Sequence, residues 1–156
     1  MSVSAAQVLI RYAEVADLAH IIELCHQHAQ FEGANYSAEG KLASLRIALF
    51  AEVPALYCVV VELDADIVAY ASYMRQFSTW DAGYYLYMDC LYLKDEVRGL
   101  GIGAKLMQWI RGEAKRLHCK HIQWQTPIDN ESAIGFYRQQ GAIDKTKARF
   151  FLSIKG

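Results

Sequence analysis

The chain has 156 residues, of which 54% are hydrophobic and 21% charged, a balance that excludes a disordered polypeptide. Its length fits one domain, 1–156, with a substantial core. The net charge of −1 argues against nucleic-acid binding through a broad basic surface, and no apolar run is long enough for a membrane span. Four scattered cysteines without a C-x-x-C pair, and an amino-terminal segment unlike a secretory signal, predict a cytoplasmic protein with reduced thiols.

The first third of the chain predicts one strand and two helices. Residues 8–13 are typical of a short strand, and an apolar stripe predicts a helix over 16–31. Ser37 is a candidate N-cap for a second helix over 38–50, which Pro54 keeps from continuing. Three leucines of that helix are expected to face inward: Leu42, Leu45 and Leu49.

The middle of the chain predicts a meander of strands. The segment 56–63 is rich in β-branched and aromatic residues, and the turn 64–66 returns the chain into a strand over 67–77. A second turn at 81–83 leads into a strand over 84–93.

The last third alternates strand and helix. A helix is expected to begin near Gly101, followed by a strand over 121–126 and a helix over 130–140 that Gly141 ends. A final strand is expected over 147–154. This order predicts an α/β fold with a single mixed sheet.

A glycine-rich turn, R-x-x-G-x-G at 98–103, separates the strand over 84–93 from the next helix. Glycine permits unusual backbone angles and close approach of a ligand, and amides at a helix N-terminus attract anions such as phosphate. Arg98 adds a permanent positive charge. The pattern is not a dinucleotide fingerprint, because Leu106 stands where the third glycine of G-x-G-x-x-G would be required. It is not a P-loop either, because Lys105 is followed by Leu106 and not by Ser or Thr.

The whole order of elements resembles the GNAT superfamily of acetyl-CoA-dependent N-acetyltransferases. The resemblance rests on the opening I-R-Y-A-E-V-A-D at 10–17, on L-Y-L at 91–93 with the glycine turn, and on N-E-S-A-I-G-F-Y-R-Q-Q-G-A at 130–142. Residues 70–103 are similar to the spermidine/spermine N-acetyltransferase branch, which typically has Glu-Asp where this chain has Asp89-Cys90. The implied fold is a single mixed, mostly antiparallel sheet flanked by helices.

The resemblance also implies a binding site for acetyl-CoA. Main-chain groups of two β residues would hold the acetyl and pantetheine parts, the glycine turn the diphosphate, and Asn130 the pantetheine arm, although an Asn there is also a good N-cap. The implied binding residues are Leu91, Leu93, Arg98, Gly99, Leu100, Gly101, Ile102, Gly103, Ala104 and Asn130.

Three further residues are candidates for catalysis. An amine of lysine type is protonated at neutral pH, so a carboxylate must accept a proton before the nitrogen can attack a thioester. The resemblance places Asp89 on the sheet beside the thioester and makes it the first candidate, with the loop carboxylate Glu32 as the second, although each could be an ordinary hydrogen-bonded or solvated acid. The resemblance gives Tyr137 the role of the acid that protonates the departing thiolate, with a core aromatic as the alternative.

These residues favour an enzyme that transfers an acetyl group from acetyl-CoA to a primary amine of a small cationic substrate, polyamine-like or amino-acid-like, by direct attack. Acetylation of an aminated antibiotic or of a protein amine, and a non-catalytic acyl-CoA-binding module, remain alternatives. No metal site is expected, because the His and Cys clusters lack zinc-ligand spacing. Family members commonly form homodimers, which is the expected assembly here.

Overall fold

The computed structural model describes residues 8–155. Contacts along the chain divide it into two units, one ending at Gln125 and one beginning at Thr126. The two units are described separately, and the expectation of one domain over 1–156 stays a prediction.

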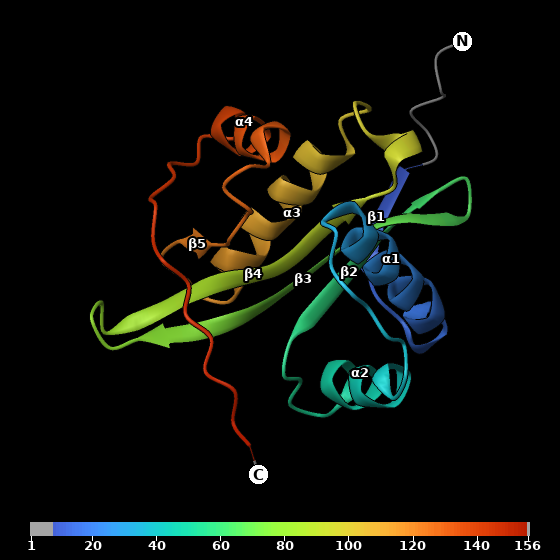
Figure 1. Ribbon diagram of the computed structural model, residues 1–156, viewed down its shortest axis with the longest axis horizontal. Coiled ribbons are helices and arrows are strands. Elements are labelled where there is room, and N and C mark those ends of the chain that lie inside the picture. Colours follow the sequence, from blue (N-terminus) through green and yellow to red (C-terminus); the bar gives the residue numbers. More distant parts are fainter. Residues whose placement is uncertain (1–7, 156) are drawn as a thin grey trace. The chain divides into compact units, whose positions relative to one another are not determined.

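The first unit is built on one five-stranded sheet in the order β1-β2-β3-β4-β5 (Figure 1). The first four strands are antiparallel neighbours, and β5 is parallel to β4. The single mixed, mostly antiparallel sheet predicted from the sequence is therefore confirmed. The strands are β1 (Val8–Tyr12), β2 (Tyr57–Leu63), β3 (Asp66–Ser78), β4 (Gly83–Leu93) and β5 (Ile122–Gln123).

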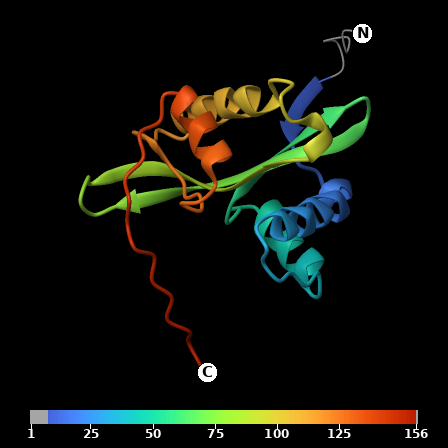
Figure 2. The ribbon, with the colours of Figure 1, turned by 45° about the horizontal axis from the view of Figure 1, so that its top comes forward.

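Helices cover both faces of this sheet. The helices α1 (Leu18–Phe31) and α2 (Lys41–Phe50) lie on one face, and α3 (Ile102–Arg116) lies on the other (Figure 2). Because successive strand residues point to opposite faces, Tyr70 and Tyr73 of β3 reach different helices. Tyr70 meets α1 and Tyr73 meets α3.

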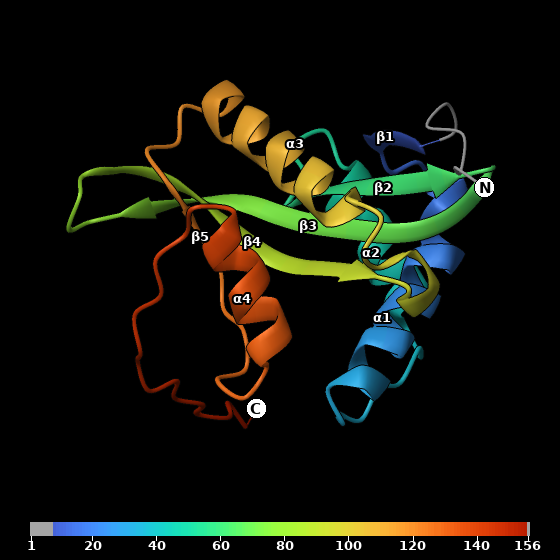
Figure 3. The ribbon, with the colours of Figure 1, turned by 90° about the horizontal axis from the view of Figure 1, so that it is seen from above.

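The core lies where β2, β3 and β4 pack against α1 and α3. Central strand residues such as Val60, Ala71 and Tyr73 are fully buried, as are Leu106 and Ile110 of α3. The hairpin of β3 and β4 continues past the last β2 pair, and it projects beyond the rest of the sheet (Figure 3).

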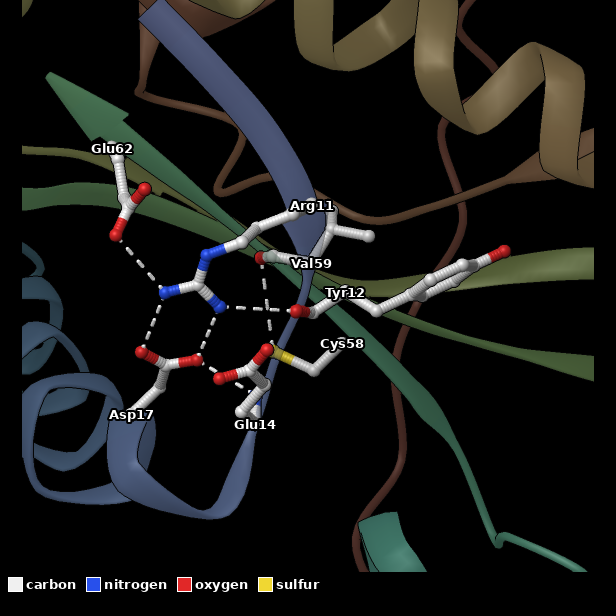
Figure 4. Close-up of polar contacts among 7 residues, drawn as sticks. All are labelled: Arg11, Tyr12, Glu14, Asp17, Cys58, Val59 and Glu62. Carbon is white, nitrogen blue, oxygen red and sulfur yellow. Dashed lines mark hydrogen bonds and ion pairs between the residues drawn. The ribbon is translucent and has the colours of Figure 1, made fainter.

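An ion-pair cluster ties β1 to the turn before α1 (Figure 4). Arg11 donates to both carboxylate oxygens of Asp17 at 2.7 and 2.9 Å, and to Glu62 on β2 at 3.2 Å. Asp17 also accepts from the main-chain N–H of Glu14 at 2.7 Å, which closes the short 3-10 turn Val15–Asp17. The hydrogen bonds from Arg11 hold the pKa of the buried Asp17 carboxyl below its usual range.

The first correction concerns the helix predicted over 38–50, which begins only at Lys41. Gly40 has a φ of 73° and caps the helix, so the preceding residues form a turn instead. Ser37 accepts from the N–H of Glu39 within that turn and is not the helix N-cap. The expectation that Leu42 faces inward is wrong, because this side chain is 48% exposed, whereas Leu45 and Leu49 are half-buried.

The second correction concerns two strands near the carboxyl end. The strand predicted over 121–126 is reduced to Ile122–Gln123, since only these two residues pair with β4. The strand predicted over 147–154 is wrong, because residues 140–155 contain no helix or strand. Alternating apolar residues favour an extended chain, but a strand requires a hydrogen-bonding neighbour.

The second unit contains the helix α4 (Glu131–Gln139). Asn130 is its N-cap, and the Asn130 side chain accepts from the N–H of Ala133 at 3.2 Å. Gly141 follows the helix with a φ of 91°, a left-handed conformation that favours glycine. The predicted helix and its end are confirmed.

Candidate active site

The glycine turn leads directly into α3. Gly99 and Gly101 have φ values of 79° and 83°, and Gly101 is the N-cap of the helix, whereas Gly103 lies in the first helical turn. No side chain caps this end of α3, and its first turn contains no acidic residue. A Cβ built on Gly99 or Gly101 would have no neighbour within 4 Å. The turn therefore presents helix amides on an open side, which suits an anion.

Arg98 braces this turn against the end of β4. Its guanidinium pairs with Asp95 at 2.8 Å and donates to the carbonyl of Leu93 at 3.2 Å. The same group lies 4.5 Å from the ring centre of Phe31 and 5.5 Å from that of Tyr92. Arg98 thus connects β4, the turn and α1, and one predicted binding group, the carbonyl of Leu93, accepts from Arg98 here.

Asp89 occupies an irregularity in β4. Ser72 pairs with Cys90 and Tyr73 pairs with Met88, so Asp89 has no opposite residue on β3. Such a bulge bends the strand and redirects the side chain of the extra residue. The Asp89 side chain is exposed, and its Oδ2 accepts a hydrogen bond from the Ser72 hydroxyl at 3.3 Å.

The edge of β4 that faces away from β3 is paired with another strand only before the bulge. β5 pairs with Leu86 and Tyr87, and within the first unit no strand accompanies β4 on that side from Asp89 onward. Leu91 and Leu93, the two predicted main-chain binding residues, follow the bulge. An extended ligand arm could therefore add to this edge of β4 as a strand would.

Glu32 lies at the C-terminal end of α1. It pairs with the His28 ring at 3.2 Å, and this ring stacks on Tyr92 of β4 with centroids 5.1 Å apart. Glu32 is consequently held near β4 through His28, on the face of the sheet that α1 covers.

The remaining two predicted site residues belong to the second unit. Asn130 caps α4, as described above, and Tyr137 lies on the same helix with its ring 5.3 Å from that of Phe136. Tyr137 is half-buried.

Sequence reasoning missed Ser72 and the surroundings of Asp89. Ser72 is the single serine or threonine within the apolar and aromatic run V-A-Y-A-S-Y-M of β3, and a small polar residue in a buried strand was the available signal. Burial, and then the charge of Asp89, raise the pKa of the neighbouring Cys90 thiol to about 12, so this thiol is neutral at pH 7.

Two further features of the described chain bear on cofactors and membranes. Over residues 8–155, no three His, Cys, Asp or Glu side chains gather as a metal-ion site, and all four cysteines are free thiols. No helix within this part of the chain has the length and apolar character needed to cross a membrane.

Residues 15–142 match the model of the Acetyltransferase (GNAT) family. The chain belongs to this family of acetyltransferases. The match includes the glycine turn, the bulged strand β4 and α4, and it spans both structural units. GNAT enzymes use acetyl-CoA as the acyl donor, so this acetyltransferase has the enzymatic class that the sequence predicted.

Individual relatives agree with this assignment. The acetyltransferase is 29% identical over 158 residues to thialysine N-epsilon-acetyltransferase of Sus scrofa, covering 96% of this chain and 92% of the relative. It is 28% identical over 142 residues to spermidine/spermine N(1)-acetyltransferase-like protein 1 of Homo sapiens, covering 86% of this chain and 20% of that longer protein. A solved aminoglycoside acetyltransferase from an uncultured soil metagenomic sample has a TM-score of 0.82 at 20% identity, covers 97% of this chain and 99% of its own, and shows the shared fold.

Proposed function

We propose that this GNAT enzyme transfers the acetyl group of acetyl-CoA to a primary amine of a small cationic substrate, by direct attack of the amine on the thioester. The observation that supports this most directly is the bulge of β4. Asp89 has no opposite residue on β3, and its carboxylate is exposed just after Leu86 and Tyr87, the residues of β4 that pair with β5. A carboxylate at the open edge of that strand can attract a cationic amine and accept its proton.

The first unit fits acetyl-CoA in two respects. The start of α3 has no side-chain cap, left-handed glycines at 99 and 101, and no acid in its first turn, and it suits the diphosphate through the amides of residues 99–104. The unaccompanied edge of β4 suits the pantetheine arm through main-chain groups of Leu91 and Leu93. Asn130 would contribute a further contact to this arm. Arg98 would act by bracing the turn, since its guanidinium is paired with Asp95.

The chemistry requires three proton movements, two from the nitrogen and one to the sulfur. Acetyl-CoA supplies the acetyl group as a thioester. Asp89 accepts the proton that the ammonium must lose, directly or through one water, and Glu32 is the alternative acceptor. The nitrogen lone pair then attacks the thioester carbonyl, and the C–N bond forms as the C–S bond breaks. Tyr137 donates its phenolic proton to the departing sulfur, and the extra proton that remains on the acetylated nitrogen is lost through solvent and restores the phenol.

The relatives support a small amine as the acceptor. Two of those aligned over most of this chain have names that refer to thialysine or to spermidine and spermine, all of which are small cationic amines. A polyamine-like or amino-acid-like amine is therefore the proposed substrate class.

A thiol-release assay with acetyl-CoA tests the proposal. The panel contains diamines, polyamines, basic amino acids, an aminoglycoside and a lysine peptide, and isothermal titration measures acetyl-CoA binding in parallel. We expect the fastest release with the small amines. Release with the aminoglycoside or the peptide alone would favour the alternative acceptors, and acetyl-CoA binding without release on any amine would favour a non-catalytic module.

Two further parts of the proposal concern assembly and location. We infer a homodimer, supported by four exposed apolar side chains near the carboxyl end: Phe150, Phe151, Leu152 and Ile154. A cytoplasmic location is supported by the four free thiols. Light scattering after gel filtration tests the dimer, for which a mass near twice 17.7 kDa is expected.

A further inference from the structure

Ser72 is a buried hydroxyl residue in the middle of the sheet. It is 6% exposed, and its β3 neighbours Ala71 and Tyr73 are fully buried, so its backbone is held firmly. A hydroxyl in such surroundings must keep a hydrogen bond to offset the loss of water. The Ser72 hydroxyl donates to Oδ2 of Asp89 at 3.3 Å.

Asp89 needs such a fixed partner because of its position in β4. The bulge leaves it without a residue opposite on β3, and its side chain is exposed. A bulge leaves the extra residue outside the regular ladder, so neighbouring side chains decide where its carboxylate is held. Ser72 stands opposite Cys90, the next residue of β4, and its hydroxyl reaches one carboxylate oxygen of Asp89, Oδ2.

The neighbouring thiol adds no competing charge. Cys90 lies beside the Asp89 carboxylate, and burial followed by that negative charge raises its pKa to about 12. The thiol is therefore protonated at neutral pH, and it does not repel the carboxylate.

We propose that Ser72 is a positioning residue for Asp89: its buried hydroxyl holds Oδ2, so that Oδ1 faces the amine whose proton it accepts. This inference rests on the proposed function, because it assigns Asp89 the role of proton acceptor. Ser72 lies on β3, whereas Asp89 lies on β4, and Ser72 would affect catalysis only by its hydrogen bond to the Asp89 carboxylate.

The test is a double-mutant cycle of Ser72→Ala and Asp89→Asn, with Ser78→Ala as the matched control. Alanine is nearly isosteric with serine, so the Ser72→Ala protein should melt near the wild-type temperature. Ser78 is also a β3 serine, but its hydroxyl accepts from the N–H of Asp81 in the hairpin turn. Measured quantities are kcat and KM for the best amine of the panel and the Kd of acetyl-CoA.

We expect Ser72→Ala to lower kcat about three- to tenfold, the range of one ordinary hydrogen bond, without changing acetyl-CoA affinity. On the Asp89→Asn background the same change should have no further effect. An unchanged kcat in Ser72→Ala, or an equal loss on both backgrounds, would overturn the proposal.

A second readout does not depend on turnover. In carbon-labelled protein, the Cγ resonance of Asp89 should shift in Ser72→Ala and stay in place in Ser78→Ala. An unshifted resonance contradicts the role of Ser72 even if the enzyme is active. Absence of thiol release from the wild-type protein on every amine, with the resonance shifted as expected, would count against the proposed function and leave the contact between Ser72 and Asp89 established.

Discussion

The hydroxyl of Tyr73 donates a hydrogen bond of 2.8 Å to Oε2 of Glu113, which joins the centre of β3 to α3. Glu113 is 6% exposed and also accepts from Tyr12 at 2.7 Å and from Arg116 at 2.9 Å. Burial alone would raise the pKa of Glu113, but the hydrogen bonds from Arg116, Tyr12 and Tyr73 outweigh it, and the pKa lies below its ordinary value. These contacts hold the helix that begins at the glycine turn.

Glu113→Gln should lower the free energy of unfolding at pH 7 by about 2 to 3 kcal/mol, because the amide carries no charge and its NH2 group cannot accept from the phenols or from Arg116. Urea denaturation measures the loss. Glu52→Gln, a change of an exposed acid after α2, is the control and should have little effect.

The same variant gives a pH dependence of known sign. Since the folded-state pKa of Glu113 is below its ordinary value of 4.5, the stabilisation is complete above that value and is lost as the pH falls through the lower folded pKa. The stability difference between wild type and Glu113→Gln should therefore be constant from pH 6 to 8 and shrink below about pH 4. A difference that grows on acidification would contradict this account.

Gly101→Ala tests the glycine turn. The φ of 83° disfavours a Cβ by about 1 to 2 kcal/mol, although no protein atom lies within 4 Å of the added carbon. We expect the strained turn to realign its amides and to weaken acetyl-CoA binding about tenfold in isothermal titration.

Gly112→Ala is the matched control for that change. Gly112 lies in α3 with an open surrounding and no positive φ, so alanine should stabilise the helix by about 0.5 to 1 kcal/mol and leave acetyl-CoA affinity unchanged. Equal affinities for the Gly101 and Gly112 variants would remove the turn from the binding site.

Asp17→Asn should destabilise the fold more than Glu62→Gln. Asp17 receives two hydrogen bonds from Arg11 and its side chain is 7% exposed, whereas Glu62 receives one at 3.2 Å and is 27% exposed. We expect losses of about 2 to 3 and about 0.5 kcal/mol in thermal or urea unfolding. The reverse order would show that Asp17 does not anchor β1.

Tyr137→Phe should reduce kcat by about a hundredfold, the lower range for a lost general acid, while the Kd of acetyl-CoA changes little. Stopped-flow or steady-state thiol release measures the effect. Tyr84→Phe, on the projecting hairpin, provides a phenol-to-phenyl control. Unchanged turnover in the Tyr137 variant would exclude it as the acid.

The sequence predicted the sheet well where the signal is local. Runs of β-branched and aromatic residues mark the strands of the meander, and the turn predicted at 64–66 is a tight hairpin in which Asp64 and Ala65 have left-handed φ values of 51° and 70°. The sequence does not predict the start of α2 correctly, because Ser37 and Gly40 are both possible N-caps. In the structure Ser37 caps a turn and Gly40 caps the helix.

Features that depend on pairing were less accessible. The bulge at Asp89 is a matter of register between β3 and β4, which no local pattern encodes, and the contact with Ser72 depends on that register. The segment 147–154 has strand composition without a strand in the described chain, because composition does not supply a neighbour. The glycine turn, in contrast, was predictable, because glycine readily adopts the positive φ values that this turn requires at Gly99 and Gly101.

The most direct test of the central claim is a titration of nitrogen-labelled protein with acetyl-CoA, followed by amide resonances. The largest shifts should fall on the amides from Gly99 to Ala104, with further shifts at Leu91 and Leu93. Saturation by acetyl-CoA with those amides unmoved, and the largest shifts elsewhere in the chain, would contradict the account.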